Sequence, residues 1–354
     1  MKAYVLQGVG QLEYKDVPLP DLKPGWVLVR TAAAGICQSD IPRIFQTGTY
    51  HFPTVPGHEF AGTVTDVYGE ESRAWLGKRV GVFPLIPCNK CFVCKEKNYE
   101  MCRSYDYLGS RRDGGFAEYV AVPQWNLIEL PDKMSMKEAA MLEPASVALH
   151  AVRRLNLAPG MSAALYGLGT IGLIITQWLH ILGVKNVYAV GRHAAHGRIM
   201  KKTAGEGYLY VQAEKGQDTV SWILEQTGGM GTDAAIDCTG TAEGISNCLR
   251  CVRPGGQVLA VGNPKGDIVL DQASYWKILR NQLRVTGTWN SSFCHYAGDD
   301  WHKTIEACVN GTLHLTELIT HSLAFDELKQ GLSIARERKE YLNKIMICES
   351  KNWQ

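Results

Sequence analysis

The sequence has almost no net charge, because 37 Lys and Arg residues balance 35 Asp and Glu residues to a formal +2. Proteins that bind nucleic acids or anionic membrane surfaces usually carry a large cationic surplus, and nothing of that kind is present. The composition is 45% hydrophobic, so the chain does not have the character of a disordered protein. We therefore expect a folded protein whose partner is a small molecule, with no nucleic acid and no membrane.

A secretion signal and a membrane span are also missing. Residues 1–7 lead into strand-like sequence and lack the apolar core and cleavage site of a signal peptide, which predicts a cytoplasmic protein. Residues 161–184 contain no Asp, Glu, Lys or Arg, but the glycines within them favour a buried strand and helix over a membrane span. The 11 cysteines are an odd number, which suits metal ligands and buried thiols better than a secreted disulfide framework.

The patterns of strands and helices divide the chain into two kinds of sequence. Residues 1 to about 130 consist of strand-like runs separated by Gly, Pro and Asp, as in a β-barrel. From residue 163 strands and helices alternate, which predicts a parallel sheet wound on both faces. After residue 284 the pattern is mixed again, so we expect the tail to return to the first domain and make it discontinuous. A length of 354 residues also favours two domains.

Between a strand-like run and an apolar helical stretch stands the pattern Gly167-x-Gly169-x-x-Gly172. Such a turn lets the backbone approach a pyrophosphate, and Thr170 and Ile171 would open the helix whose N-terminus faces the anion. The sequence therefore predicts a dinucleotide-binding turn, with an ordinary strand-to-helix turn as the alternative.

Four cysteines, Cys88, Cys91, Cys94 and Cys102, lie within fifteen residues. Four thiolates can surround a tetrahedral ion completely, which suits a structural zinc with no open position for chemistry. A disulfide pair fits a reducing compartment less well, and the spacing is not the usual one for an iron–sulfur cluster. We predict a structural zinc lobe near residues 88–102.

A second set of metal-ligand residue types is more widely spaced: Cys37, His58, Glu59 and Glu143, with Ser39 near the cysteine. A thiolate, an imidazole and carboxylates would form a mixed site with room for an exchangeable ligand, as catalytic zinc sites have. Spacing alone does not join these residues, and a His beside a Glu is more often a surface or core pair.

Taken in order, these motifs resemble those of the zinc-dependent medium-chain dehydrogenases along essentially the whole chain. The segments that carry the resemblance are Gly35–Asp40, Gly57–Val64, the four-cysteine lobe, Asp113–Tyr119, Glu143–His150 and Gly167–Gly172. The resemblance implies an α/β protein with a GroES-like catalytic domain over residues 1–150 and 287–354 and a doubly wound Rossmann domain over residues 151–286. It also implies a homodimer or homotetramer.

By this resemblance, Cys37, His58 and Glu143 hold a catalytic zinc, and Glu59 is a direct ligand or one that exchanges with water or substrate. With the lobe, this makes two zinc ions per chain. The zinc would bind the substrate oxygen while hydride passes to a nicotinamide, and Ser39 would carry the substrate proton away. A plain turn residue is the alternative for Ser39.

Within the family, residues 39–45, 105–115 and 277–280 resemble the branch that acts on sugar-alcohol phosphates such as galactitol 1-phosphate. A phosphate would need arginines near the zinc, and Trp289 falls where the family's returning segment lines the substrate cleft. Gln38 replaces the usual Gly and is expected to narrow the site. The candidate arginines are Arg43, Arg111, Arg112 and Arg280.

Other functions stay open. An unphosphorylated polyol, a simple alcohol or threonine is an alternative substrate for the same kind of enzyme. From a different class, the chain could be a zinc-stabilised, nucleotide-binding structural protein without turnover. Such a protein would have no need of an open metal site.

The choice of cofactor depends on the end of the second strand of the alternating region. NAD-binding folds of this type usually place an acid there for the adenosine ribose, but the sequence reads Gly191-Arg192-His193. Arg192, with His193 or Arg198, could contact a 2′-phosphate. NADP is therefore favoured. NAD stays possible if Arg192 only stacks on the adenine.

Overall fold

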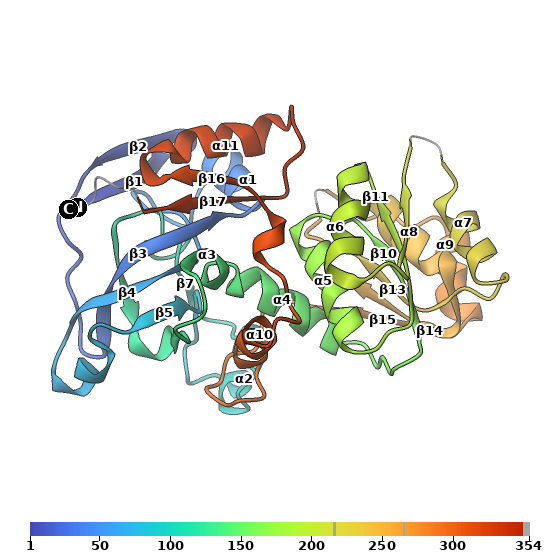
Figure 1. Cartoon of the computed structure of the whole chain (residues 1–354), viewed down its shortest axis with the longest axis horizontal. Coiled ribbons are helices and arrows are strands. Elements are labelled where there is room, and N and C mark those ends of the chain that lie inside the picture. The colour runs from blue at the N-terminus through green and yellow to red at the C-terminus, as the bar shows by residue number, and fades with distance from the viewer. Residues whose placement is uncertain (215–216, 265, 350–354) are drawn as a thin grey trace. The chain divides into compact units, whose positions relative to one another are not determined.

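A computed structural model describes residues 1–214, 217–264 and 266–349 of the chain, and Figure 1 shows its helices and strands. The chain forms two compact units. Of the described residues, the first contains 1–144, 292–310 and 319–349, and the second contains 145–214, 217–264, 266–291 and 311–318. No helix in the described ranges is long and apolar enough to cross a membrane.

The first unit is built on a seven-stranded sheet in the order β16-β17-β3-β4-β5-β9, with β8 also paired to β3. Its strands are β1 (Lys2–Gly8), β2 (Gln11–Asp16), β3 (Trp26–Ile36), β4 (Glu59–Val67), β5 (Arg79–Val82), β6 (Leu85–Ile86), β7 (Asp106–Tyr107), β8 (Tyr119–Pro123), β9 (Leu127–Glu129), β16 (Ile319–Ala324) and β17 (Lys344–Cys348). Its helices are α1 (Asp40–Pro42), η1 (Arg43–Thr47), η2 (Glu70–Trp75), α2 (Phe92–Lys95), η3 (Tyr99–Met101), η4 (Gln124–Asn126), α3 (Met136–Ala139), α10 (Asp300–Val309), η6 (Phe325–Glu327) and α11 (Leu328–Glu337). Helix α4 (Leu142–Arg153) begins in this unit and continues in the second.

The long strand β3 is the centre of the first unit. Val27 and Val29 on this strand are fully buried, and such β-branched side chains pack well on a pleated surface. They join a core that also contains Tyr4, Phe60 and Phe325. Strand β17 pairs antiparallel with β3, so the C-terminal segment returns to the first unit, as the sequence predicts. The structure thus confirms the predicted mixed α/β fold.

The second unit is a six-stranded parallel sheet in the order β12-β11-β10-β13-β14-β15. Helices α5 and α6 pack on one face of this sheet, and α7, α8 and α9 pack on the other (Figure 1), which is the predicted doubly wound arrangement. The strands are β10 (Ser162–Tyr166), β11 (Asn186–Gly191), β12 (Leu209–Gln212), β13 (Thr232–Asp237), β14 (Val252–Ala260) and β15 (Arg284–Gly287). The helices are α5 (Thr170–Ile181), α6 (Ala194–Ala204), α7 (Thr219–Gln226), α8 (Ala242–Cys251), α9 (Gln272–Arg280) and η5 (Thr316–Leu318).

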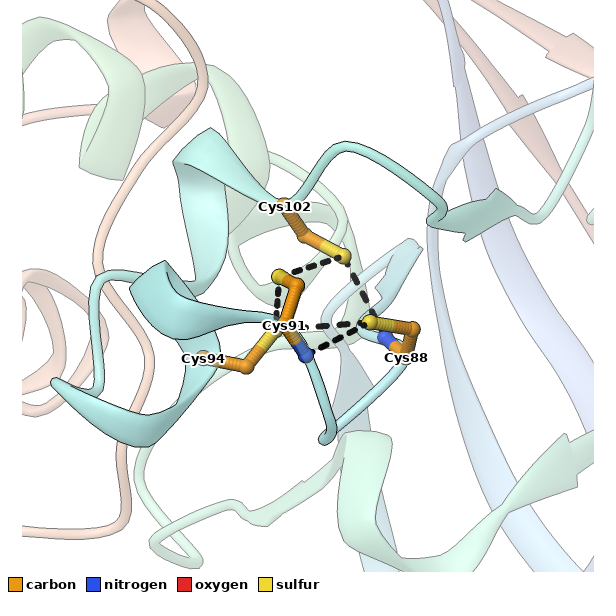
Figure 2. A group of neighbouring side chains, drawn as sticks. All are labelled: Cys88, Cys91, Cys94 and Cys102. Carbon is orange, nitrogen blue, oxygen red and sulfur yellow. Dashed lines mark hydrogen bonds between the residues drawn. The ribbon is translucent and has the colours of Figure 1, made fainter.

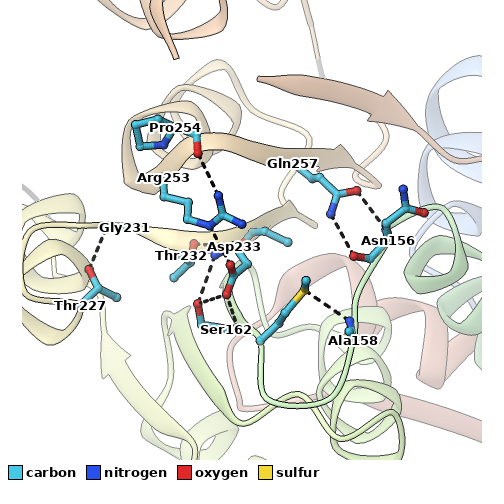
Figure 3. Close-up of polar contacts among 12 residues, drawn as sticks. Asn156, Ala158, Ser162, Thr227, Gly231, Thr232, Asp233, Arg253, Pro254 and Gln257 are labelled. Atoms are coloured by element: carbon cyan, nitrogen blue, oxygen red, sulfur yellow. Dashed lines mark hydrogen bonds and ion pairs between the residues drawn. The ribbon is translucent and has the colours of Figure 1, made fainter. Parts of the chain in front are cut away.

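One carboxylate ties together the starts of three neighbouring strands in this sheet (Figure 3). Asp233 Oδ2 on β13 accepts hydrogen bonds from the backbone N–H and the hydroxyl of Ser162 on β10, both at 2.8 Å. Its Oδ1 accepts one from Arg253 Nε on β14 at 2.7 Å. These bonds lie at the amino ends of the strands. Ligands bind at the carboxyl ends of strands in such sheets, and the Gly167–Gly172 turn follows the carboxyl end of β10.

Candidate metal centres and cofactor turn

The four cysteines of the predicted lobe face one another (Figure 2). Their ligand atoms all lie within 4.8 Å, and neighbouring sulfurs are 3.4 Å apart for Cys91 and Cys94 and 3.9 Å for Cys88 and Cys94. A tetrahedral zinc with Zn–S bonds of about 2.3 Å separates its sulfurs by roughly 3.8 Å, so this cage fits such an ion. All four thiols are free, which excludes a disulfide here.

The local fold of the lobe shifts its thiols in opposite directions: burial raises the pKa of Cys94 to about 12, whereas the pKa of Cys91 is lowered. The chain turns from β6 into α2 and then η3, which brings the four residues together within one short excursion. Backbone hydrogen bonding at Cys94 is the main reason why the pKa of Cys91 falls to about 6. A thiolate is the form of cysteine that binds metals.

The second group consists of Cys37, His58 and Glu59, whose ligand atoms also lie within 4.8 Å of one another. Cys37 follows the last residue of β3, and Glu59 is the first residue of β4. These strands pair antiparallel with Gly35 opposite Glu59, so the pairing itself brings the two ends together. His58 and Glu59 are buried, whereas Cys37 is partly exposed. A sulfur, a nitrogen and an oxygen donor form a mixed ligand set of the kind that catalytic zinc uses.

Asp40 contacts two members of this group, a role that was not predicted from the sequence. Its fully buried carboxylate accepts a hydrogen bond from the backbone N–H of Cys37 at 2.9 Å, and its Oδ1 lies 3.3 Å from His58 Nδ1. Burial alone would lower the pKa of His58, but Asp40 raises that pKa well above its usual value. With Nδ1 directed at Asp40, the other ring nitrogen of His58 is the one available to a metal.

Glu143, in the first turn of α4, lies beside the group of three but is not one of its members. Its Oε1 accepts a hydrogen bond from Tyr107 Oη at 3.2 Å, and the Tyr107 ring lies 5.9 Å from the His58 ring. Burial raises the pKa of Glu143 to about 7, and Glu59 adds to this effect. A nearby cation would stabilise the ionised form of this buried carboxyl.

Glu59 already has a cationic partner. Lys344 Nζ lies 2.5 Å from Glu59 Oε2, and both side chains are buried. Burial alone would lower the pKa of Lys344, but the Glu59 carboxylate raises it. Lys344 is 285 residues away in the chain and arrives through the pairing of β17 with β3, so no local pattern in the sequence could have indicated it.

Ser39 and Gln38 lie in the same loop as Cys37 but point to different partners. Ser39 Oγ donates to Cys37 Sγ at 3.3 Å. Gln38 is exposed, and its side-chain oxygen accepts a hydrogen bond from Arg338. This contact gives no support to the expectation that Gln38 narrows the site.

The predicted substrate residues fall into two sets. Arg43, Arg111 and Arg112 belong to the first unit with the mixed ligand group, whereas Arg280 and Trp289 belong to the second. Arg280 ends helix α9 with its guanidinium 4.1 Å from the Trp276 ring centroid, and Trp289 is 53% exposed.

The glycine turn has the form that its sequence predicts. Gly167 follows β10 with φ +94°, and Thr170 and Ile171 open helix α5. A Cβ on Gly172 would lie 2.0 Å from the Gly167 carbonyl oxygen, so only glycine fits there. A Cβ on Gly169 would meet no atom within 4 Å. The turn is therefore tightly packed on its inner side and open at Gly169, as a pyrophosphate cradle requires.

At the end of β11, the structure exposes the residues predicted to choose between cofactors. Gly191 ends the strand, Arg192 follows it, His193 caps helix α6, and Arg198 lies within that helix. Arg192, His193 and Arg198 are all exposed, and no acid stands at this strand end.

Comparisons with known proteins agree with these features. Residues 23–132 match the family model described as alcohol dehydrogenase GroES-like domain, and residues 170–310 match zinc-binding dehydrogenase. Galactitol 1-phosphate 5-dehydrogenase of Escherichia coli K12 is 31% identical over 338 residues, which cover 95% of this chain and 97% of the relative. Sorbitol dehydrogenase of Bacillus subtilis is 28% identical, with 99% and 98% covered.

Solved structures show the same similarity. The crystal structure of galactitol-1-phosphate dehydrogenase from Escherichia coli matches with a TM-score of 0.88 and 29% identity, covering 98% of this chain and 100% of that one. A Sinorhizobium meliloti protein described as a zinc-binding dehydrogenase and solved with NADP matches with a TM-score of 0.88 and 27% identity, covering 98% of both chains.

Proposed function

Because this chain belongs to the zinc-dependent medium-chain dehydrogenases, we propose that it oxidises a secondary alcohol of a polyol or of a polyol phosphate like galactitol 1-phosphate. The product is the corresponding ketose, and the hydride passes to NAD(P). The chain is an oxidoreductase that acts on CH–OH groups, and its substrate is a small molecule. The observation that carries the proposal is the mixed group of Cys37, His58 and Glu59 in a chain that also has an intact dinucleotide turn.

Cys37, His58 and Glu143 are the proposed ligands of the catalytic zinc, with Glu59 as a ligand that exchanges. When bound, zinc supplies the Lewis acidity that stabilises the deprotonated substrate oxygen. The ion pair with Lys344 supports exchange at Glu59, because one Glu59 oxygen is already engaged. Asp40 orients His58 through its contact with Nδ1. The Ser39 hydroxyl lies beside the Cys37 sulfur and is the proposed relay for the substrate proton, which it takes up while it passes its own proton on toward solvent.

A substrate panel tests this function. We expect the purified protein to contain two zinc ions per chain and to oxidise at least one polyol or polyol phosphate with NAD or NADP. Turnover only with a simple alcohol or with threonine would move the activity to that substrate class. Absence of all turnover, with zinc only in the cysteine lobe, would favour the nucleotide-binding structural protein.

NADP is the proposed preferred cofactor, supported by the exposed arginine at the end of β11. Replacing Arg192 by alanine is expected to lower kcat/KM for NADP by about 10- to 100-fold, the cost of losing a charged hydrogen bond to phosphate. The same change should alter kcat/KM for NAD less than about threefold. Initial rates with each cofactor measure both values. An unchanged NADP-to-NAD ratio would show that Arg192 does not bind the 2′-phosphate.

A homodimer or homotetramer acting in the cytoplasm completes the proposal. Strand β15 stands at the edge of the parallel sheet with Val285 47% exposed, and helix α9 nearby exposes Tyr275, Trp276 and Leu279. An edge strand with apolar neighbours is a surface on which a second copy can pair. The mass of the protein in solution measures its oligomeric state.

The proposed compartment is supported by the cysteines. All 11 cysteines are free thiols, which suits a reducing compartment.

A further inference from the structure

The guanidinium of Arg111 contacts two tyrosine rings and has no acidic partner in the part of the chain that the structure describes. Its Cζ lies 4.0 Å from the Tyr50 ring centroid and 4.6 Å from the Tyr105 ring centroid. Its Nε is buried without a hydrogen-bond partner. Removing a charge from water is costly unless an opposite charge or hydrogen bonds compensate it. This cation is therefore prepared for an anion that the chain itself does not provide.

The two other candidate arginines of the first unit already have carboxylate partners. Arg43 pairs with Asp40 at 3.5 Å, and Arg112 pairs with Asp106 at 2.8 Å. An arginine that keeps its own carboxylate would have to lose that partner or share it before binding a second anion. Of the three, Arg111 is the one whose charge stays available.

The position of Arg111 is fixed by the loop opposite. The backbone N–H of Tyr50 donates to the Ser110 carbonyl at 3.2 Å, and His51 Nε2 lies 3.1 Å from the Arg111 carbonyl. Tyr50 is 67% exposed, so this side of the contact is open to solvent. Both rings contact the guanidinium at cation–π distance, and such contacts do not use its in-plane N–H groups, which are the groups that can bind a ligand. Those N–H groups match phosphate and carboxylate geometry.

A row of aromatic rings connects Arg111 with the mixed ligand group. The Tyr105 ring lies 6.1 Å from the Tyr107 ring, and the Tyr107 ring lies 5.9 Å from His58. Tyr107 also donates to Glu143. The cation and the metal ligands are thus the two ends of one packed row within the first unit. A substrate bound at both ends would place its reacting hydroxyl at the metal ligands and an anion at Arg111.

We propose that Arg111, in contact with Tyr50 and Tyr105, binds a terminal oxyanion of the polyol substrate and makes the enzyme selective for anionic sugar alcohols. The oxyanion is a phosphate or a carboxylate. The inference rests on the proposed polyol dehydrogenase function, and it selects one of the three candidate arginines in the first unit.

The kinetic test compares Arg111→Gln, Arg111→Lys and the control Arg73→Gln, which removes the same charge from an exposed site paired with Glu70. Each variant is assayed with a hexitol 1-phosphate, with an aldonate and with the uncharged hexitol. We expect Arg111→Gln to raise KM for the preferred anionic substrate by about 10- to 100-fold, which is the cost of one charged hydrogen-bonded contact. KM for the uncharged hexitol should change by less than about threefold, with kcat retained. The KM of Arg111→Lys for the anionic substrate should lie between those of the unmodified enzyme and Arg111→Gln. Arg73→Gln should have the KM values of the unmodified enzyme.

The anionic substrate whose KM rises more in Arg111→Gln, the hexitol phosphate or the aldonate, identifies the oxyanion. Equal losses on charged and uncharged substrates would overturn the proposal. If the unmodified protein oxidises no polyol, a binding experiment tests the role of Arg111 separately. Inorganic phosphate, added to protein saturated with NADP, should raise Tm for the unmodified protein and for Arg73→Gln but not for Arg111→Gln. Equal stabilisation of all three would also overturn it.

Discussion

Replacing Cys37 by alanine is expected to remove one of two zinc ions per chain and to lower kcat/KM for the substrate by about 10³-fold or more. The sulfur of Cys37 is one of three donor atoms within 4.8 Å of one another, so its loss leaves only one nitrogen and one carboxylate in that group. A bound metal contributes several kcal/mol of charge stabilisation, and each 1.36 kcal/mol corresponds to a factor of about ten in rate. Metal analysis and steady-state kinetics measure the two effects.

The matched control for this variant is Cys348→Ala. Cys348 is a partly buried thiol on β17 of the same unit, and it belongs to neither cysteine-containing metal group. Its replacement should retain both zinc ions and full activity. A Cys37→Ala protein that keeps two zinc ions and the original rate would show that the catalytic centre lies elsewhere.

Replacing Cys94 by alanine is expected to act on stability instead. Cys94 is buried at the centre of the lobe, with the sulfurs of Cys91 and Cys88 3.4 and 3.9 Å away. Structural zinc contributes about 10 kcal/mol to small zinc peptides, and we expect a fraction of this, about 3–5 kcal/mol, within a larger domain. The expected decrease in Tm is roughly 10 °C, with one zinc ion lost per chain.

Cys248→Ala is the control for the lobe. Cys248 is fully buried in the second unit, so its replacement also removes a buried sulfur, but it has no role in either metal group. We expect a loss of about 1 kcal/mol and two retained zinc ions. If the Cys94 and Cys248 variants have the same Tm and the same zinc content, the lobe holds no structural metal. The two variants of the metal groups should also differ from each other, since Cys37→Ala should lose activity with little change in Tm.

Features formed by neighbouring residues could be predicted from the sequence. The Gly167–Gly172 turn and the Cys88–Cys102 lobe each form within a single stretch of chain, so their spacing alone restricts the geometry. The alternation of strands and helices from residue 163 likewise predicts the parallel sheet, because short connections between such elements allow few arrangements. The change in pattern after residue 284 predicts a return to the first unit, but β15 still belongs to the parallel sheet and residues 311–318 to the second unit.

Contacts between distant segments were decided only by the tertiary structure. The pairing of β17 with β3 brings Lys344 to Glu59, and no local pattern specifies which strand pairs with which. Glu143 is assigned by resemblance, but its hydrogen bond to Tyr107 joins the first turn of α4 to β7, 36 residues earlier in the chain, which only the folded chain shows. The four candidate arginines were equivalent in the sequence, because a charge shows its partner only when the chain is folded. Folding supplied carboxylates to Arg43 and Arg112 but only aromatic rings to Arg111, and this difference makes Arg111 the one of these three that is prepared to bind an anion.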